Sequence, residues 1–62
     1  MWVLIKYKEP NDETVYEAVI QALSEDIGVD FFMAERDGQP TEIEDAELFL
    51  FEDELPQWYQ DL

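Results

Sequence analysis

The chain has 62 residues, of which 17 are Asp or Glu and 3 are Lys or Arg, so its net charge is −14. This imbalance excludes direct binding to nucleic acid, because affinity for phosphates comes from Lys and Arg, and it opposes contact with anionic membranes. The chain has no cysteine, no histidine and one serine, Ser24, so it lacks the means for thiol chemistry, zinc binding or serine-type nucleophilic catalysis. We expect neither an enzyme nor a cofactor.

The composition nevertheless predicts a folded domain spanning residues 1–62. Hydrophobic residues make up 47% of the chain and aromatic residues 15%, whereas disordered chains are poor in both aromatic and β-branched residues. The apolar run at residues 1–5 ends at Lys6 and is too short for a signal segment or a membrane span. The expectation is a soluble, cytoplasmic protein.

The first half of the chain predicts a strand followed by a helix. Residues 2–8 are rich in β-branched and aromatic side chains, which favours a strand. Residues 10–13 are typical of the start of a helix, with Asn11 or Asp12 as the N-cap, and Thr14 with Glu17 offers a competing capping box. Gly28 is the expected end of this helix. Five apolar residues before it follow helical spacing: Val15, Ala18, Val19, Ala22 and Leu23.

The second half predicts two further strands and a helical turn. Residues 29–35 and 46–52 have the apolar character of strands, and residues 37–40 have the turn chemistry of a hairpin. Residues 41–44 add a short strand or stay a loop. The segment after Pro56 predicts one helical turn at residues 57–62. The predicted fold class is therefore α+β, a small β-α-β-β sheet with one amphipathic helix and a short C-terminal aromatic segment.

The predicted strands are apolar on both faces, whereas a single helix covers only one face of a sheet. Phe31 and Met33 oppose Phe32 within one strand, and the same holds within residues 48–51. The second face then needs a cover. The favoured cover is the segment containing Trp58 and Tyr59; a homodimer or a bound partner would serve the same purpose.

The acids that follow residue 41 are the candidate functional residues. They lie in two runs, and Trp58 and Tyr59 are expected beside them as aromatic anchors; the acids are Glu42, Glu44, Asp45, Glu47, Glu52, Asp53 and Glu54. On an extended segment, residues i and i+2 lie on the same side about 6.6 Å apart, so these rows imitate the spaced charges of a nucleic-acid backbone. Neither run has the alternating ligands and central glycine of a calcium loop. No metal site is expected.

No residue motif ties the chain to a particular family, but its size, charge and aromatic content resemble those of the small acidic DNA-mimic inhibitors of phages and mobile elements. Those proteins block host nucleic-acid enzymes and defence systems. The resemblance implies stoichiometric inhibition by occupation of a basic groove. The leading hypothesis is accordingly an acidic nucleic-acid mimic whose partner is a basic DNA- or RNA-binding protein.

Three alternatives stay open from the sequence. A small adaptor or assembly subunit would bind its partner through the apolar sheet face and through Trp58 and Tyr59. An antitoxin-like protein would neutralise a basic partner, which the sequence does not separate from mimicry. Finally, an excess of acids is also typical of salt-adapted domains, although a net charge of about 2–8 in magnitude is enough to keep a small domain soluble.

Overall fold

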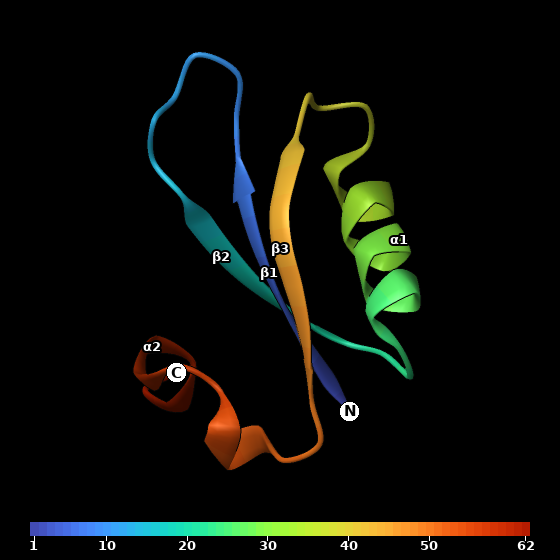
Figure 1. Ribbon diagram of the computed structural model, residues 1–62, viewed down its shortest axis with the longest axis vertical. Helices are drawn as coiled ribbons and strands as arrows, with labels where there is room; N and C mark the ends of the chain where they lie inside the picture. The colour runs from blue at the N-terminus through green and yellow to red at the C-terminus, as the bar shows by residue number, and fades with distance from the viewer.

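Three antiparallel strands in the order β2-β1-β3 form the centre of the protein, with one main helix on one face of the sheet. The computed structural model describes all 62 residues and confirms the α+β class (Figure 1). Its elements in chain order are β1 (Trp2–Lys8), β2 (Tyr16–Gln21), α1 (Glu25–Arg36), β3 (Glu42–Phe49), a 3-10 turn η1 (Glu52–Glu54) and a short helix α2 (Gln57–Gln60). None of the helices has the length and apolar character needed to span a bilayer.

The predicted order of the elements was wrong, because the order is β-β-α-β rather than β-α-β-β. Of the five apolar residues assigned to a helix before Gly28, Ala18 and Val19 lie in β2, and the other three lie just before or after this strand. Ala18 and Ile20 both lie on the core side, so alternation with period two prevails over the helical spacing that the same residues also satisfy. Asp12 does not cap a helix; its side chain accepts a hydrogen bond from the Thr14 amide (2.8 Å) within the loop that joins β1 to β2.

The helix occupies the region predicted as the second strand, residues 29–35. It begins after Ser24, whose hydroxyl accepts a hydrogen bond from the Ile27 amide (3.2 Å), and Glu25 follows in the first turn, where an acid suits the helix dipole. It ends at Asp37 and Gly38, which adopt φ of 41° and 79°. The predicted turn at 37–40 therefore ends a helix rather than closing a hairpin.

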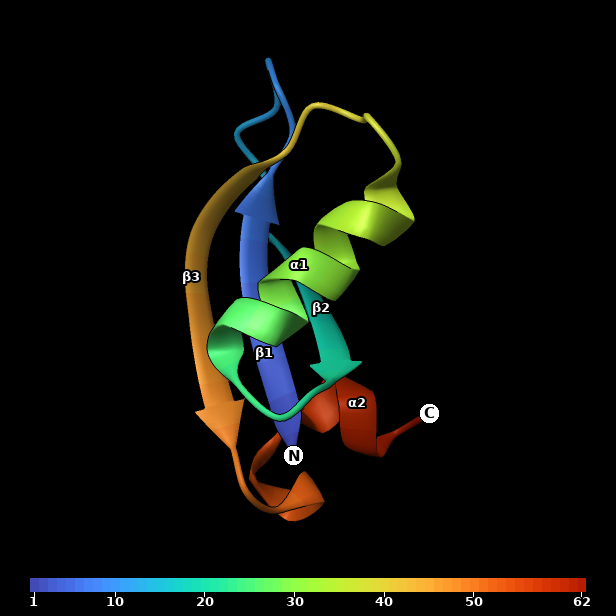
Figure 2. The same cartoon turned by 90° about the vertical axis from the view of Figure 1, so that its right-hand side faces the viewer.

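The connection from β2 through α1 to β3 crosses over β1. Both outer strands run antiparallel to β1, so they are parallel to each other but not adjacent, and two such strands need a long crossover connection. Figure 2 shows α1 lying obliquely over the sheet as it makes this crossing. Residues 41–44, predicted as a short strand or a loop, fall almost wholly within β3, and the predicted C-terminal helical turn is confirmed as α2.

The core lies between β1 and α1. Val3 and Ile5 of β1 are fully buried, and Phe32 of α1 packs with them. Gly28 faces Val3 so closely that a Cβ atom at Gly28 would lie 2.7 Å from Val3 Cγ2. Gly28 was predicted to end a helix; it lies inside one because only glycine allows this approach of helix to sheet.

A β-bulge in β3 determines which side chains face the core. The register pairs Lys6 with Asp45 and Tyr7 with Ile43, which leaves Glu44 as the extra residue. Ile43 and Ala46 are three residues apart, yet both pack against the core. A regular strand would turn them to opposite faces, so the bulge keeps Ile43 and Ala46 on the core side while the acids of β3 lie on the other.

The C-terminal segment covers part of the sheet face opposite α1. Figure 1 shows α1 and α2 on opposite sides of the sheet. Leu4 points away from α1, because it lies between Val3 and Ile5, and is only 6% exposed; Leu55, which precedes α2, is 5% exposed. Trp58 Nε1 donates a hydrogen bond to Glu17 Oε1 of β2 (2.9 Å). The predicted cover by the Trp58–Tyr59 segment agrees with this arrangement.

Replacing Gly28 with alanine should destabilise the protein by about 1–2 kcal/mol, because the clash with Val3 outweighs the better helix propensity of alanine. Urea unfolding would measure the change. Val3→Ala removes the two methyl groups that the new Cβ would meet at 2.7 and 3.1 Å but keeps Val3 Cβ at 2.8 Å. It should therefore relieve part of the clash, and the double variant should be more stable than the sum of the two single changes predicts. If the changes in the free energy of unfolding of the two single variants simply add up in the double variant, the close approach of Gly28 to Val3 does not restrict how the helix packs on the sheet.

Leu55→Ala should cost about 2–3 kcal/mol in the free energy of unfolding, since it empties a buried site. It should also speed amide hydrogen exchange in residues 55–62. Leu50→Ala is the matched control, because Leu50 is 60% exposed and its loss should change stability by less than about 0.5 kcal/mol. Equal effects of the two variants would mean that the C-terminal segment does not cover the sheet.

Candidate acidic interface

The sheet face opposite α1, called the open face below, carries the acids of β3. Residues paired directly across strands share a face, so Glu42, Asp45 and Glu47 lie with Lys8, Lys6 and Leu4 on the side away from the core. Glu44 joins them from the bulge, where its Oε1 lies 3.3 Å from Lys8 Nζ. All four acids of β3 are exposed. The bulge therefore brings to one face acids that strict alternation would have divided between two.

Glu17 of β2 also belongs to the open face, as the register partner of Lys6. The helical spacing of its neighbours predicts a helix at Glu17, so the sequence does not identify this residue as part of the acidic face. The available signal was the alternation of Ala18 and Ile20, which turns Glu17 to the opposite side. The open face thus carries five carboxylates and two lysines from three strands.

The other predicted site residues lie elsewhere. The three acids of η1, Glu52 to Glu54, follow β3 at one end of the molecule and are exposed. Trp58 lies on α2 and bonds to Glu17 of β2, rather than standing beside the acids of β3. Tyr59 packs against Trp58 edge to face, with 6.1 Å between ring centroids. The structure thus brings the β3 acids together and separates them from the η1 acids, and Trp58 joins the open face through Glu17.

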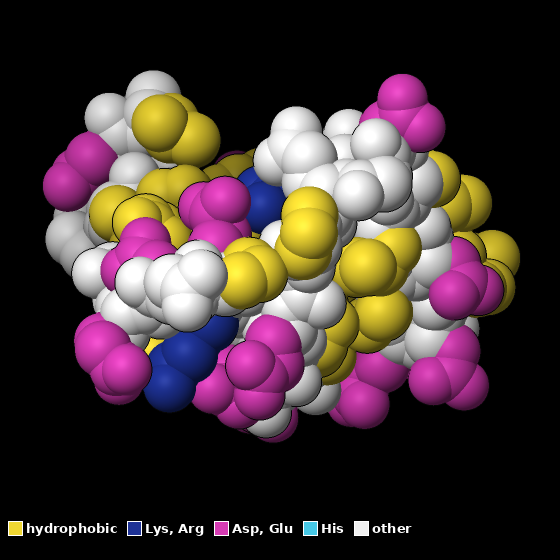
Figure 3. All heavy atoms as spheres, turned by 90° about the horizontal axis from the view of Figure 1, so that it is seen from above, with side chains coloured by type: hydrophobic (Ala, Val, Ile, Leu, Met, Phe, Trp, Pro, Cys, Tyr) yellow, Lys and Arg dark blue, Asp and Glu magenta, His cyan; other side chains and the backbone are white.

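Each of the three basic residues has an acid opposite or beside it. Lys8 pairs with Glu44, and Lys6 stands between its register partners Glu17 and Asp45. Arg36 Nη2 lies 3.3 Å from Glu9 Oε2, and the Arg36 side chain is only 15% exposed. Seen from the end that carries the β1–β2 loop, acids lie along the left, lower and right edges with apolar side chains between them, and the few Lys and Arg atoms in view lie beside acids (Figure 3). Hence little positive surface is left.

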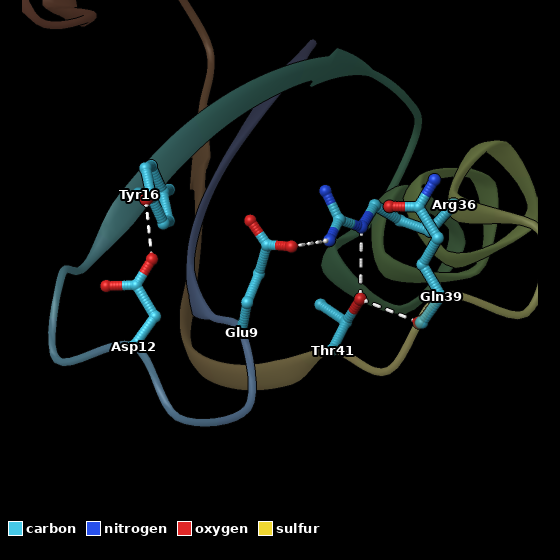
Figure 4. A network of polar contacts seen from close by, with 6 residues as sticks. All are labelled: Glu9, Asp12, Tyr16, Arg36, Gln39 and Thr41. Carbon is cyan, nitrogen blue, oxygen red and sulfur yellow. Dashed lines mark hydrogen bonds and ion pairs between the residues drawn. The ribbon is translucent and has the colours of Figure 1, made fainter.

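Arg36 ties together the two loops at this end of the molecule, as Figure 4 shows. Its Nε donates a hydrogen bond to Thr41 Oγ1 (3.0 Å), and the Thr41 hydroxyl donates in turn to the Gln39 carbonyl (3.0 Å). The guanidinium lies 4.9 Å from the centre of the Tyr7 ring, a cation–π distance. Its Nη2 contact with Glu9 is an ion pair without hydrogen-bond geometry. The role of Arg36 in this arrangement is structural.

The side chains of Asp12 and Tyr16 form a short hydrogen bond beside the β1–β2 loop. The Tyr16 hydroxyl donates to Asp12 Oδ2 (2.6 Å), which lowers the pKa of Asp12 below 3.8, with the Thr14 amide adding to the effect. The same bond and the negative charge of Asp12 raise the pKa of Tyr16 above 10.0. Both pKa shifts favour the charge states that these side chains already have at neutral pH, an ionised Asp12 and a neutral Tyr16. Neither side chain therefore becomes a general acid or base that works near neutral pH.

The arrangement places exposed carboxylates on one face of the sheet. The side chains form no group of three or more Asp or Glu able to hold a metal ion. Ser24 is engaged as the cap of α1. Comparison of the chain with protein-family models, curated proteins and solved structures found no match.

Asp12→Asn should bring the pKa of Tyr16 back toward 10.0, since the neutral amide neither carries the charge nor accepts as strongly. NMR titration of the tyrosine ring carbons would measure it, and Tyr16→Phe would assign the signal. In the parent protein, the contribution of Asp12 to stability is present above its ordinary pKa and is lost as pH falls through its lowered value. The contribution of Tyr16 is present below 10.0 and is lost as pH rises through its raised value. Glu13→Gln is the matched control and should leave Tyr16 unchanged.

Proposed function

We propose that this protein is an acidic nucleic-acid mimic that inhibits a DNA- or RNA-binding protein by occupying its basic groove, as phage and mobile-element factors do against host enzymes or defence systems. The observation that carries the proposal is the density of charge along the molecule. Its longest dimension is 33 Å and its net charge is −14, so 33 Å divided by 14 gives about one net negative charge per 2.4 Å. Duplex DNA carries one per about 1.7 Å of axis, and a single strand one per about 3.4 Å.

The placement of the acids supports this proposal. On the open face the β3 acids follow an extended backbone, with a rise of about 3.3 Å per residue. The three basic residues lie where acids of the same chain accompany them, so a basic groove would meet carboxylates with little competing positive charge. Such a surface accelerates association with a cationic partner and makes it sensitive to salt.

The adaptor hypothesis loses part of its proposed surface. It requires an open apolar sheet face, whereas Leu4 on that face is 6% exposed and the neighbouring Leu55 is 5% exposed. Trp58, its other anchor, is held by Glu17. The acids of β3 on this face, in contrast, are all exposed.

The proposal predicts that binding depends on the acids of the open face. The triple variant Glu42→Gln, Asp45→Asn and Glu47→Gln should weaken binding by about tenfold, since each exposed charge pair contributes about 0.2–1 kcal/mol. The matched control changes three exposed acids outside the open face: Glu13→Gln, Glu35→Gln and Asp37→Asn. It lowers the net charge equally and should weaken binding less.

The partner would be captured by passing nuclease-treated bacterial lysate over the immobilised protein, eluting with a salt gradient and identifying proteins by mass spectrometry. The expected result is a nucleic-acid-binding protein that elutes at moderate salt and is displaced by DNA or RNA. If the two triple variants lose binding affinity equally, binding depends on net charge alone and not on the position of the acids. A partner that resists salt and ignores nucleic acid would contradict mimicry.

A further inference from the structure

An apolar groove lies on the helix side of the sheet, at the end opposite the β1–β2 loop. It has a volume of about 440 Å³ and is lined by Met1, Gln21, Ala22, Leu23, Ile27 and Phe31. Leu23 is 74% exposed and Phe31 52% exposed. The groove exists because α1 crosses the sheet obliquely and leaves this corner beside β2 uncovered (Figure 2). Exposed apolar side chains gathered in this way are typical of a contact surface.

Acids border this groove along α1. Asp26 and Asp30 immediately precede Ile27 and Phe31 in the sequence, so each pair is spaced i, i+4 and the two rows run side by side along the helix. Glu25 adds a third carboxylate to the same end of α1. Arg36 is the only basic residue of the helix; it lies at the other end of α1 and forms an ion pair with Glu9. Met1, which carries the N-terminal ammonium, and Gln21 line the groove at the sheet, so the carboxylates are concentrated on its helix side. An apolar centre beside such a row of acids favours a partner that carries basic residues next to an apolar side chain.

Two other occupants fit less well. A second copy of this chain would bring two domains of net charge −14 into contact, with Asp26 and Asp30 of each near the interface. The chain's own C-terminal segment lies on the opposite side of the sheet (Figure 1). Charge complementarity therefore selects a cationic segment.

We infer that the groove receives an apolar side chain, Leu or Phe, from a segment of the partner in which Lys or Arg flanks it. The inference rests on the proposed function, because it concerns the same basic partner, and it adds an anchor that charge alone does not supply. The acids of the open face attract the partner and the groove retains it. Loss of the anchor increases the rate of dissociation, whereas loss of the charges lowers the rate of association.

The test uses two synthetic basic peptides of equal charge, one with a central Phe-Leu pair and the other with Ser-Ser in its place. Binding to the isotope-labelled protein is followed by NMR at physiological salt. The Phe-Leu peptide should bind about tenfold more tightly, as expected for partial burial of one large apolar side chain, and should shift the amide signals of Leu23, Ile27 and Phe31.

The double variant Leu23→Ser and Phe31→Ser should remove the tenfold difference between the peptides. Both side chains are more than half exposed, so the fold should survive, which circular dichroism would verify. Val15→Ser is the matched control, because Val15 is 48% exposed and lies outside the groove; it should keep the difference.

The outcomes separate the anchor from mimicry. Equal binding of the two peptides, with shifts confined to the acids of the open face, would overturn the anchor and leave the proposed function standing. Failure of both peptides to bind even at low salt would contradict both proposals. Sedimentation equilibrium showing a dimer that the double variant abolishes would overturn the inference in favour of a second copy.

Discussion

The fold depends on the contact between Gly28 of α1 and Val3 of β1. β1 is the central strand, and its inward side chains Val3 and Ile5 are the two that are fully buried. The helix lies close enough to cover them because Gly28 has no side chain. Only six apolar residues are buried in the whole chain, while the net charge of −14 acts against compaction. Efficient packing at this one contact is what lets so small a core hold together.

The bulge in β3 connects this core to the acidic surface. It allows Ile43 and Ala46 to face the core although they are an odd number of residues apart. The same shift turns Glu44 toward Lys8 on the open face. Apolar burial and charge display are thus two results of one irregularity in the backbone, and neither face of β3 can be altered by a change of register without changing the other.

The sequence predicted the first strand, the last strand in part, the C-terminal helical turn and the α+β class. It failed where one segment satisfied two periodicities: Ala18, Val19 and their neighbours fit a helix by spacing, but they form the edge strand β2. The position of Gly28 was predicted wrongly for a related reason. In a sequence, a glycine inside a helix cannot be distinguished from a glycine that ends one until the residue packed against it is known. The acids of β3 were identified, but their common face depends on the bulge, which alternation alone does not reveal.

The distribution of charge argues against solubility as its sole cause. A net charge of about 2–8 in magnitude suffices for a soluble small domain, and like charges spaced i, i+4, such as Asp26 and Asp30, cost a few tenths of a kcal/mol. Each of the three basic residues lies beside an acid of the same chain, which reduces the repulsion among the carboxylates there. In the proposed function, carboxylates on several sides would meet an incoming partner with little opposing charge. The apolar groove at one end would then give that partner a preferred orientation, which a uniformly charged surface would not.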